Sequence, residues 1–233
     1  MLTAQGFSKA FEYWKLFLQG VACTVSLSAL TVVFGFILAL ILAICRMGKL
    51  KVLKALATVY VELFRATPMV VQIFLIFYVV FDGVKVLPGY KLFGFIRFER
   101  FFPAVVALSL NSGAYLSEII RSGIQSIDGG QTEAARSLGL NAWKTMRFVV
   151  LPQAIKNILP AIANEFVTII KESAICYTIG VQDIMSAVNA VKGATYRMGE
   201  ALIIATALYF CLTYPTSKII AHFERKMSVG DKR

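Results

Sequence analysis

Five long apolar stretches constrain this chain more than any other feature of its sequence. They cover residues 17–45, 55–81, 102–120, 155–170 and 201–221. A helix needs about 20 apolar residues to cross the hydrocarbon core of a bilayer. Hydrophobic residues make up 58% of the chain, which is too many for a soluble domain with a solvated surface. The sequence therefore predicts an all-α, polytopic membrane helix bundle of about five transmembrane helices.

The distribution of Lys and Arg predicts that the N-terminus lies outside and the C-terminus lies in the cytoplasm. Basic residues are retained on the cytoplasmic side of a membrane. In this orientation, segments 46–54, 121–156 and 218–233 are cytoplasmic and hold 14 of the 24 basic residues, against nine outside. The first apolar stretch has no obvious small-residue cleavage site, so we expect a retained span rather than a signal peptide.

The formal net charge of +11 does not indicate a nucleic-acid partner. The basic residues lie at the ends of the apolar stretches, where positive-inside retention and anionic lipid explain them. We therefore expect membrane lipid as a partner and no nucleic acid.

Few residues of the chain suit catalysis or metal binding. The four cysteines share no close spacing, and His222 is the only histidine. A phosphate-binding Gly-x-x-x-x-Gly-Lys-Ser/Thr sequence does not occur. We expect no catalytic residues, no metal site and no cofactor in this chain, which argues against a membrane enzyme.

Small residues recur at steps of four along the first apolar stretch, as Gly20, Thr24 and Ser28, and then as Thr31, Gly35, Ala39 and Ala43. Such rows let helix backbones approach closely in lipid. We expect them to pack against another helix of this subunit or of a partner.

The cytoplasmic segment between the third and fourth stretches predicts a helix-turn-helix. Asp128 can cap a helix, with Gln131 reaching back in a capping box. Gly139 suits the left-handed residue that ends this helix, and Asn141 can cap a second short one. Pro152 either ends the second helix or begins the next.

Trp143, Met146 and aliphatic residues would give this element an apolar face, although it lies outside the lipid. Such a face can pack on the bilayer interface, under the chain's own helices or into a partner's groove. The residues alone do not choose among the three.

This segment resembles the Glu-Ala-Ala loop of the membrane subunits of type I ABC importers. Only Val149, where that family has Ile, departs from the pattern. The resemblance implies that the loop, residues 126–152, forms coupling helices that seat in a cleft of an ATP-binding subunit. The matching residues are Glu133, Ala134, Ala135, Gly139, Leu151 and Pro152.

Segments 61–72, 112–124 and 164–173 are similar to the polar amino acid subfamily of these permeases. Most of residues 21–227 shares the resemblance, and we expect one permease domain over residues 1–233. The resemblance implies import of polar amino acids across a bacterial cytoplasmic membrane by alternating access.

The resemblance also implies three partners. These are a dimer of ATP-binding subunits that bind ATP and Mg, a second permease subunit, identical or different, and an extracytoplasmic amino acid-binding protein. The excess of acidic over basic residues within the spans hints at a cationic substrate. An independent channel or secondary carrier for small polar solutes is the alternative function.

Ionisable residues within a span mark either a pathway or a structural pair. Glu62 and Arg65 can neutralise each other at i, i+3 spacing, and we favour this structural ion pair over direct substrate contact by Arg65. Pro68 removes a backbone hydrogen bond near the middle of the second span, where we expect a kink.

Polar side chains on three spans fall at a similar depth, as expected for a transport site at the bilayer midplane. Glu165 could pair with a cationic group while the others supply hydrogen bonds. The alternative is that each bonds helix to helix. The candidate substrate-binding residues are Thr67, Gln72, Asn111, Ser112 and Glu165.

Overall fold

The computed structural model describes residues 2–83, 85 and 87–228 and is mostly helical. The α-helices are α1 (Ala4–Phe11), α2 (Trp14–Met47), α3 (Lys51–Ala66), α4 (Met69–Phe74), α5 (Phe98–Gln125), α6 (Gly129–Ser137), α7 (Ala142–Thr145), α8 (Leu151–Glu172), α9 (Ile184–Thr195) and α10 (Met198–Ser228). Two π-helical segments, η1 (Leu75–Val80) and η2 (Met146–Val150), and one 3₁₀ segment, η3 (Ser173–Ile179), continue neighbouring helices. Strands β1 (Lys91–Leu92) and β2 (Ile96–Arg97) form an antiparallel hairpin.

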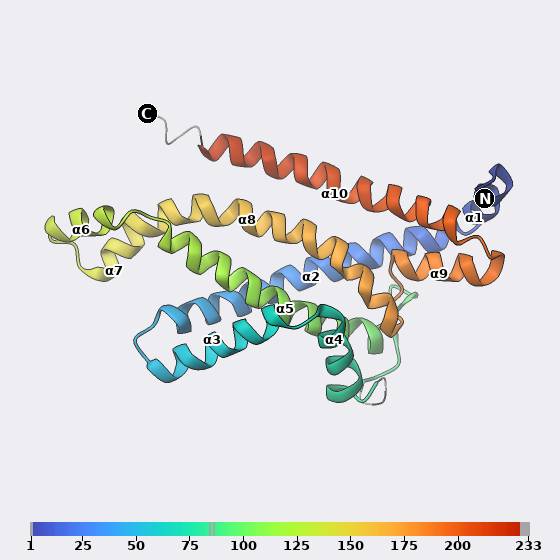
Figure 1. Cartoon of the computed structure of the whole chain (residues 1–233), viewed down its shortest axis with the longest axis horizontal. Coiled ribbons are helices and arrows are strands. Elements are labelled where there is room, and N and C mark those ends of the chain that lie inside the picture. Colours follow the sequence, from blue (N-terminus) through green and yellow to red (C-terminus); the bar gives the residue numbers. More distant parts are fainter. Residues whose placement is uncertain (1, 84, 86, 229–233) are drawn as a thin grey trace.

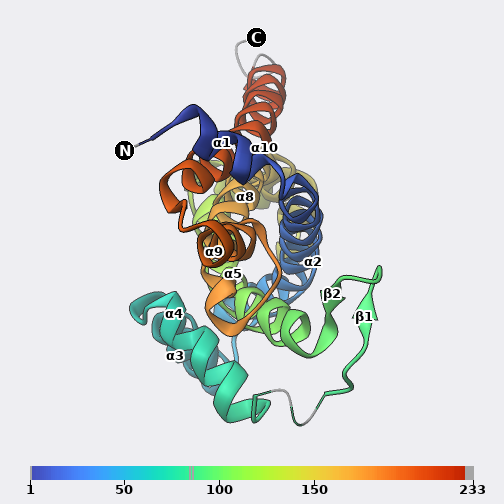
Figure 2. The same cartoon turned by 90° about the vertical axis from the view of Figure 1, so that its right-hand side faces the viewer.

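The long helices α2, α5, α8 and α10 run along the long axis of the molecule (Figure 1). Helices α6 and α7 lie at one end, which we call the loop end. Helices α1 and α9 lie at the opposite end, which is the outer end in the orientation that the basic residues predict. The view in Figure 2 places α3 and α4 at one edge of the bundle and α10 at the other, with α5, α8 and α9 between them.

Each of the five predicted spans coincides with a helix, although the second is broken. By length and apolar composition, α2 and α10 are long enough to cross a membrane, and up to four segments are if each bent helix pair counts as one span. Helix α5 is not among them. It lies within the bundle and carries buried polar side chains, including Ser109, Asn111, Ser112 and Ser117.

The predicted kink in the second span is a much sharper corner. The axes of α3 and of α4 with η1 differ by 110°. Thr67, before the proline, has extended backbone with φ −109° and ψ 144°. Proline disfavours the helical conformation in the residue before it, so α3 ends at Ala66 and a new helix begins after Pro68.

The row of small residues on α2 is buried, as the sequence predicts, from Gly20 to Ala43. A Cβ atom added to Gly35 would lie 3.1 Å from Ser112 Oγ on α5, so these two helices are in close contact. A Cβ atom on Gly20 would lie 2.8 Å from the backbone oxygen of Asp183, just before α9. The small residues therefore seat both α5 and α9 against α2.

Helix α1 and the β1–β2 hairpin were not predicted from the sequence. Thr3 caps α1 by accepting a hydrogen bond from the backbone N–H of Gly6 at 3.1 Å. Helix α1 is only eight residues long and precedes the first apolar stretch. The hairpin lies between the second and third apolar stretches, which is outside in the orientation that the basic residues predict.

We expect Gly20→Ala to destabilise the protein because the added methyl group meets backbone atoms of Asp183 and Ile184, which cannot rotate away. Overpacking of this kind costs about 1–3 kcal/mol. Thermal unfolding of the purified protein in detergent measures the effect. Gly193→Ala is the matched control, since a Cβ atom there meets nothing within 4 Å and should slightly stabilise α9. Equal midpoints for the two variants would contradict the close α2–α9 contact.

Candidate functional site

The loop end contains the predicted helix-turn-helix. Asp128 caps α6 by accepting a hydrogen bond from Gly130 N–H at 2.6 Å. Gly139 has the predicted left-handed backbone, with φ +85°, and donates its N–H to the carbonyl of Arg136. Asn141 caps α7 by accepting from Lys144 N–H at 2.9 Å. The helix boundaries in this loop are therefore set by short-range polar contacts.

One detail of the predicted loop is wrong. The side chain of Gln131 does not complete a capping box with Asp128, because its oxygen accepts a hydrogen bond from Gln153 Nε2 at 3.5 Å. This contact joins α6 to α8. Pro152 is the second residue of α8, which continues α7 and η2 without a break, so it neither ends a helix nor begins a separate one.

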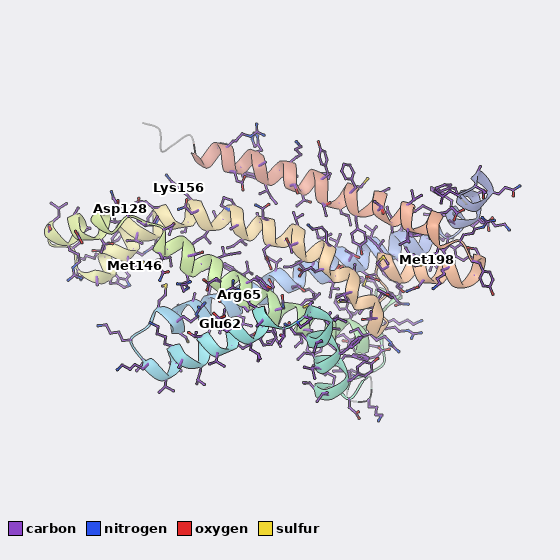
Figure 3. The ribbon with its side chains drawn as sticks, in the orientation of Figure 1. Glu62, Arg65, Asp128, Met146, Lys156 and Met198 are labelled. Carbon is purple, nitrogen blue, oxygen red and sulfur yellow. The ribbon has the colours of Figure 1, made fainter. Side chains whose placement is uncertain are left out.

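Large apolar side chains at the loop end are exposed. Leu138 is 85% exposed, Trp143 67% and Phe148 64%, and the two rings meet edge to face at 6.3 Å. Figure 3 labels Asp128 and Met146 at this end. Exposure excludes packing of this face under the chain's own helices. The bilayer surface and a partner's groove are left as its possible contacts.

The corner between α3 and α4 is held by side-chain amides. Pro68 has no N–H group for the carbonyl of Phe64, its usual acceptor four residues earlier. Gln72 Nε2 donates to that carbonyl at 2.8 Å and Asn111 Nδ2 approaches it at 3.5 Å. Asn111 also donates to Gln72 Oε1 at 2.8 Å. Two buried amides thus replace the hydrogen bond that proline removes.

Thr67 completes this network, which therefore unites three of the five candidate substrate residues. Its hydroxyl accepts from Gln72 Nε2 and donates to the carbonyl of Leu63, both at 2.8 Å. A groove of about 140 Å³ lies in the corner. It is lined by Leu63, Phe64, Thr67, Val71, Gln72, Leu75 and Ile76.

The other two candidates meet on a different face of α5. Ser112 is 2% exposed and packs against Gly35 of α2. Glu165, on α8, interacts with Ser112, whose hydroxyl makes no hydrogen bond of standard geometry. The structure therefore arranges the five candidates as two groups, which adjacent residues of α5, Asn111 and Ser112, connect.

The predicted ion pair between Glu62 and Arg65 is wrong. Within the described residues, the carboxylate nearest to Arg65 is that of Glu118 on α5, at 4.0 Å. Glu118 also binds Arg46 of α2 at 2.7 Å and Arg121 of its own helix. Figure 3 shows Glu62 and Arg65 on α3 beside α5. Among the described residues, Glu62 makes no ion pair with Arg65 and has only a weaker electrostatic attraction to Arg121 of α5.

Sequence reasoning missed this cluster because its members are far apart in the chain. Arg46 is 8% exposed and ends the first apolar stretch, while Glu118 and Arg121 end the third. The first and third spans of a membrane protein run in the same direction, so their C-terminal ends lie on the same side. That relation could have suggested the pairing of Arg46 with Glu118. Within residues 2–83, 85 and 87–228, no group of three or more His, Cys, Asp or Glu side chains suits a metal ion.

A helical bundle with membrane-spanning helices, a broken helix beside buried polar groups and an exposed loop at one end defines a polytopic membrane permease. A family described as "Binding-protein-dependent transport system inner membrane component" matches residues 22–229. The chain belongs to this family, and it is the permease component of a transport system of that kind.

Relatives from bacteria carry related names. The arginine transport system permease protein ArtQ of Bacillus subtilis is 40% identical over 97% of this chain and 98% of its own length. The putative glutamine transport system permease protein GlnP of Rickettsia conorii is 37% identical, over 94% and 96% respectively. The L-cystine transport system permease protein TcyB of Bacillus subtilis is 34% identical, over 93% and 88%.

Solved structures agree with these relatives. A crystal structure of an amino acid ABC transporter with histidines contains a chain that is 40% identical, with a TM-score of 0.87 over 97% of this chain and 100% of that one. The MetNI methionine ABC transporter shares the fold, with 19% identity and a TM-score of 0.63 over 90% of this chain and 96% of that one.

Replacing Gln72 by Met should destabilise the corner, because the carbonyl of Phe64 and the amide of Asn111 would lose their buried partner. An unsatisfied buried group costs about 1–3 kcal/mol. Unfolding in detergent measures the loss. Gln19→Met changes an exposed side chain of α2 in the same way and should shift stability by less than about 0.5 kcal/mol. A Gln72→Met variant as stable as Gln19→Met would show that the amide does not support the bend.

Proposed function

We propose that this chain is the membrane subunit of an ATP-driven importer that moves polar amino acids across the bacterial cytoplasmic membrane by alternating access. It would act as one permease domain, residues 1–233, with its coupling loop at 126–152. The observation that carries the proposal is the rigid, capped loop with exposed apolar side chains at the end of the bundle opposite α1 and α9.

The proposed contact of this loop is a separate ATP-binding subunit. That subunit binds ATP and Mg and performs the hydrolysis, while this chain contributes no cofactor and no catalytic residue. The exposed side chains of Leu138, Trp143 and Phe148 support seating in a partner's groove. The residues assigned to coupling are Glu133, Ala134, Ala135, Gly139, Leu151 and Pro152.

The full importer would contain two ATP-binding subunits. Since each seats one coupling loop, a second permease is needed, either a copy of this chain or a different one. The family description makes transport depend on a binding protein, which would deliver the amino acid at the outer end. The same dependence argues against an independent channel or secondary carrier.

The proposed substrate is a polar amino acid, and a cationic one is favoured. Relatives are named for arginine, glutamine and L-cystine. Glu165 would pair with the cationic group, because a carboxylate between helices is otherwise costly to bury. Thr67, Gln72, Asn111 and Ser112 would supply hydrogen bonds, although the first three also hold the corner of α3 and α4.

Gly139→Val should abolish copurification with the ATP-binding subunit while the permease still inserts in the membrane. A β-branched residue strains a backbone with φ +85°, although a side chain there meets no other atom within 4 Å. Affinity purification of the coexpressed complex measures the loss. Gly129→Ala, in the same loop but with ordinary backbone and open space, is the control and should retain the complex. Equal recovery of the ATP-binding subunit with both variants would count against docking through this turn.

Glu165→Gln should raise the KM for arginine import about tenfold or more, since a hydrogen bond to a charged group contributes about 1.5–3 kcal/mol. Import of neutral glutamine by the same proteoliposomes serves as the internal control and should change little. Glu165→Asp keeps the charge and should recover part of the affinity. Unchanged arginine affinity in the Gln variant would rule out Glu165 as the charge partner.

A further inference from the structure

Tyr196 joins α9 to α10 at the outer end in an unfavourable backbone conformation. Its φ is +58° and its ψ 19°, which is the left-handed region, and its N–H donates to the carbonyl of Lys192 at 2.9 Å. Helices commonly end with such a residue, but Gly or Asn usually fills the position. For another residue the conformation costs about 1–2 kcal/mol.

No contact of the tyrosine side chain with the described residues compensates for this cost. At 92% exposure, Tyr196 is the most exposed of the large hydrophobic side chains in the described residues. A residue that breaks a local rule without an internal gain is expected at a functional site. This position therefore suggests contact with another molecule.

The surroundings of Tyr196 have the composition of a protein interface. A shallow depression of about 330 Å³ is lined by Leu2, Tyr196, Arg197, Met198, Gly199 and Glu200. Leu2 is 57% exposed and Met198 40% exposed. Aromatic residues, Met and Arg are enriched where proteins bind one another, and Tyr and Arg are frequent energetic anchors.

Arg197 and Glu200 give the depression itself one charge of each sign, and further basic side chains lie on the neighbouring helices. Arg197 lies 3.5 Å from the carboxylate of Glu200, which is itself only 3% exposed. Lys192 precedes Tyr196 by one turn of α9, and Lys9 lies on α1, which packs against α9 and α10. A partner with acidic residues around its contact surface would be electrostatically complementary.

The depression lies at the end of the molecule away from the loop. Figure 3 labels Met198 at one end of the long axis and Asp128 and Met146 near the other. Helix α10 has 31 residues and is therefore about 46 Å long, against about 30 Å of hydrocarbon. Its first residues can project beyond the membrane on the side that faces the binding protein.

We propose that Tyr196, with Leu2 and Met198, is a docking anchor for the solute-binding protein, whose contact surface carries a pocket for the tyrosine ring and an acidic rim. The inference rests on the proposed function and adds the residues through which the outer partner is held. Tyr196 lies apart from the transport pathway and contacts none of the candidate substrate residues.

The test uses the complete transporter in lipid nanodiscs, with purified arginine- and glutamine-binding proteins as probes. Tyr196→Asn should weaken binding of the protein that stimulates the wild-type ATPase by about thirtyfold, the loss typical of an interface anchor. Basal ATP hydrolysis should be unchanged. The unfolding midpoint should stay equal or rise, because Asn suits the left-handed backbone. Tyr196→Phe keeps the ring and should bind almost normally.

Phe93→Asn is the matched control. Phe93 is also left-handed, with φ +52°, and 82% exposed, but it lies in the turn of the β1–β2 hairpin. Figure 2 shows this hairpin on the other side of the outer end from the α9–α10 junction. The control should bind the probe like the wild type. Met198 also lines the depression, so Met198→Gln is a second variant that should weaken binding.

Three results would overturn the inference. The first is wild-type affinity in both Tyr196→Asn and Met198→Gln, and the second is an equal loss in Phe93→Asn. The third is a loss that appears only in nanodiscs containing anionic lipid, which would assign the tyrosine to the membrane surface. If neither probe stimulates the wild-type ATPase, the proposed function is contradicted for these substrates, and the docking inference falls with it.

Discussion

Helices that meet in a bilayer gain little from the hydrophobic effect, so the close contact of α2 and α5 depends on the shape of their surfaces. Gly35 lets Ser112 and the backbone of Gly113 approach α2 directly. Helices α3, α4 and α8 then pack against α5. Tyr60 of α3 donates to the carbonyl of Leu110 at 2.8 Å, and Gln72 of α4 is held by Asn111. The bundle is therefore organised around one central helix that small residues allow to be buried.

A helix that breaks inside a membrane leaves backbone groups that the rest of the structure must hydrogen-bond, since lipid offers no hydrogen bonds. At the corner of α3 and α4, Gln72 and Asn111 supply these hydrogen bonds. Both amides are therefore already hydrogen-bonded within the protein. A bound amino acid that drew on them would have to offer hydrogen bonds of equal quality in return, so recognition and the shape of the broken helix are energetically coupled.

The sequence predicted best what is decided within a few residues. Asp128, Gly139 and Asn141 fixed the loop correctly because caps and turns depend on immediate neighbours. The angle at Pro68 was missed because it depends on amides supplied from α4 and α5. The partner of Arg65 was predicted wrongly for a related reason. The i, i+3 spacing shows that Glu62 is within reach, but it does not show that Glu118 competes for the guanidinium. Likewise, the depth of a polar residue in the membrane does not by itself decide whether that residue binds substrate.

The loop of residues 126–152 is built directly into two of the long helices. Helix α5 ends at Gln125, three residues before the Asp128 cap, and η2 runs without interruption into α8. Asn111 and Ser112 lie on α5, and Glu165 lies on α8. The loop therefore joins the ends of the two helices that carry Asn111, Ser112 and Glu165. A displacement applied to α6 and α7 would therefore move α5 and α8, and with them the polar residues that these two helices carry.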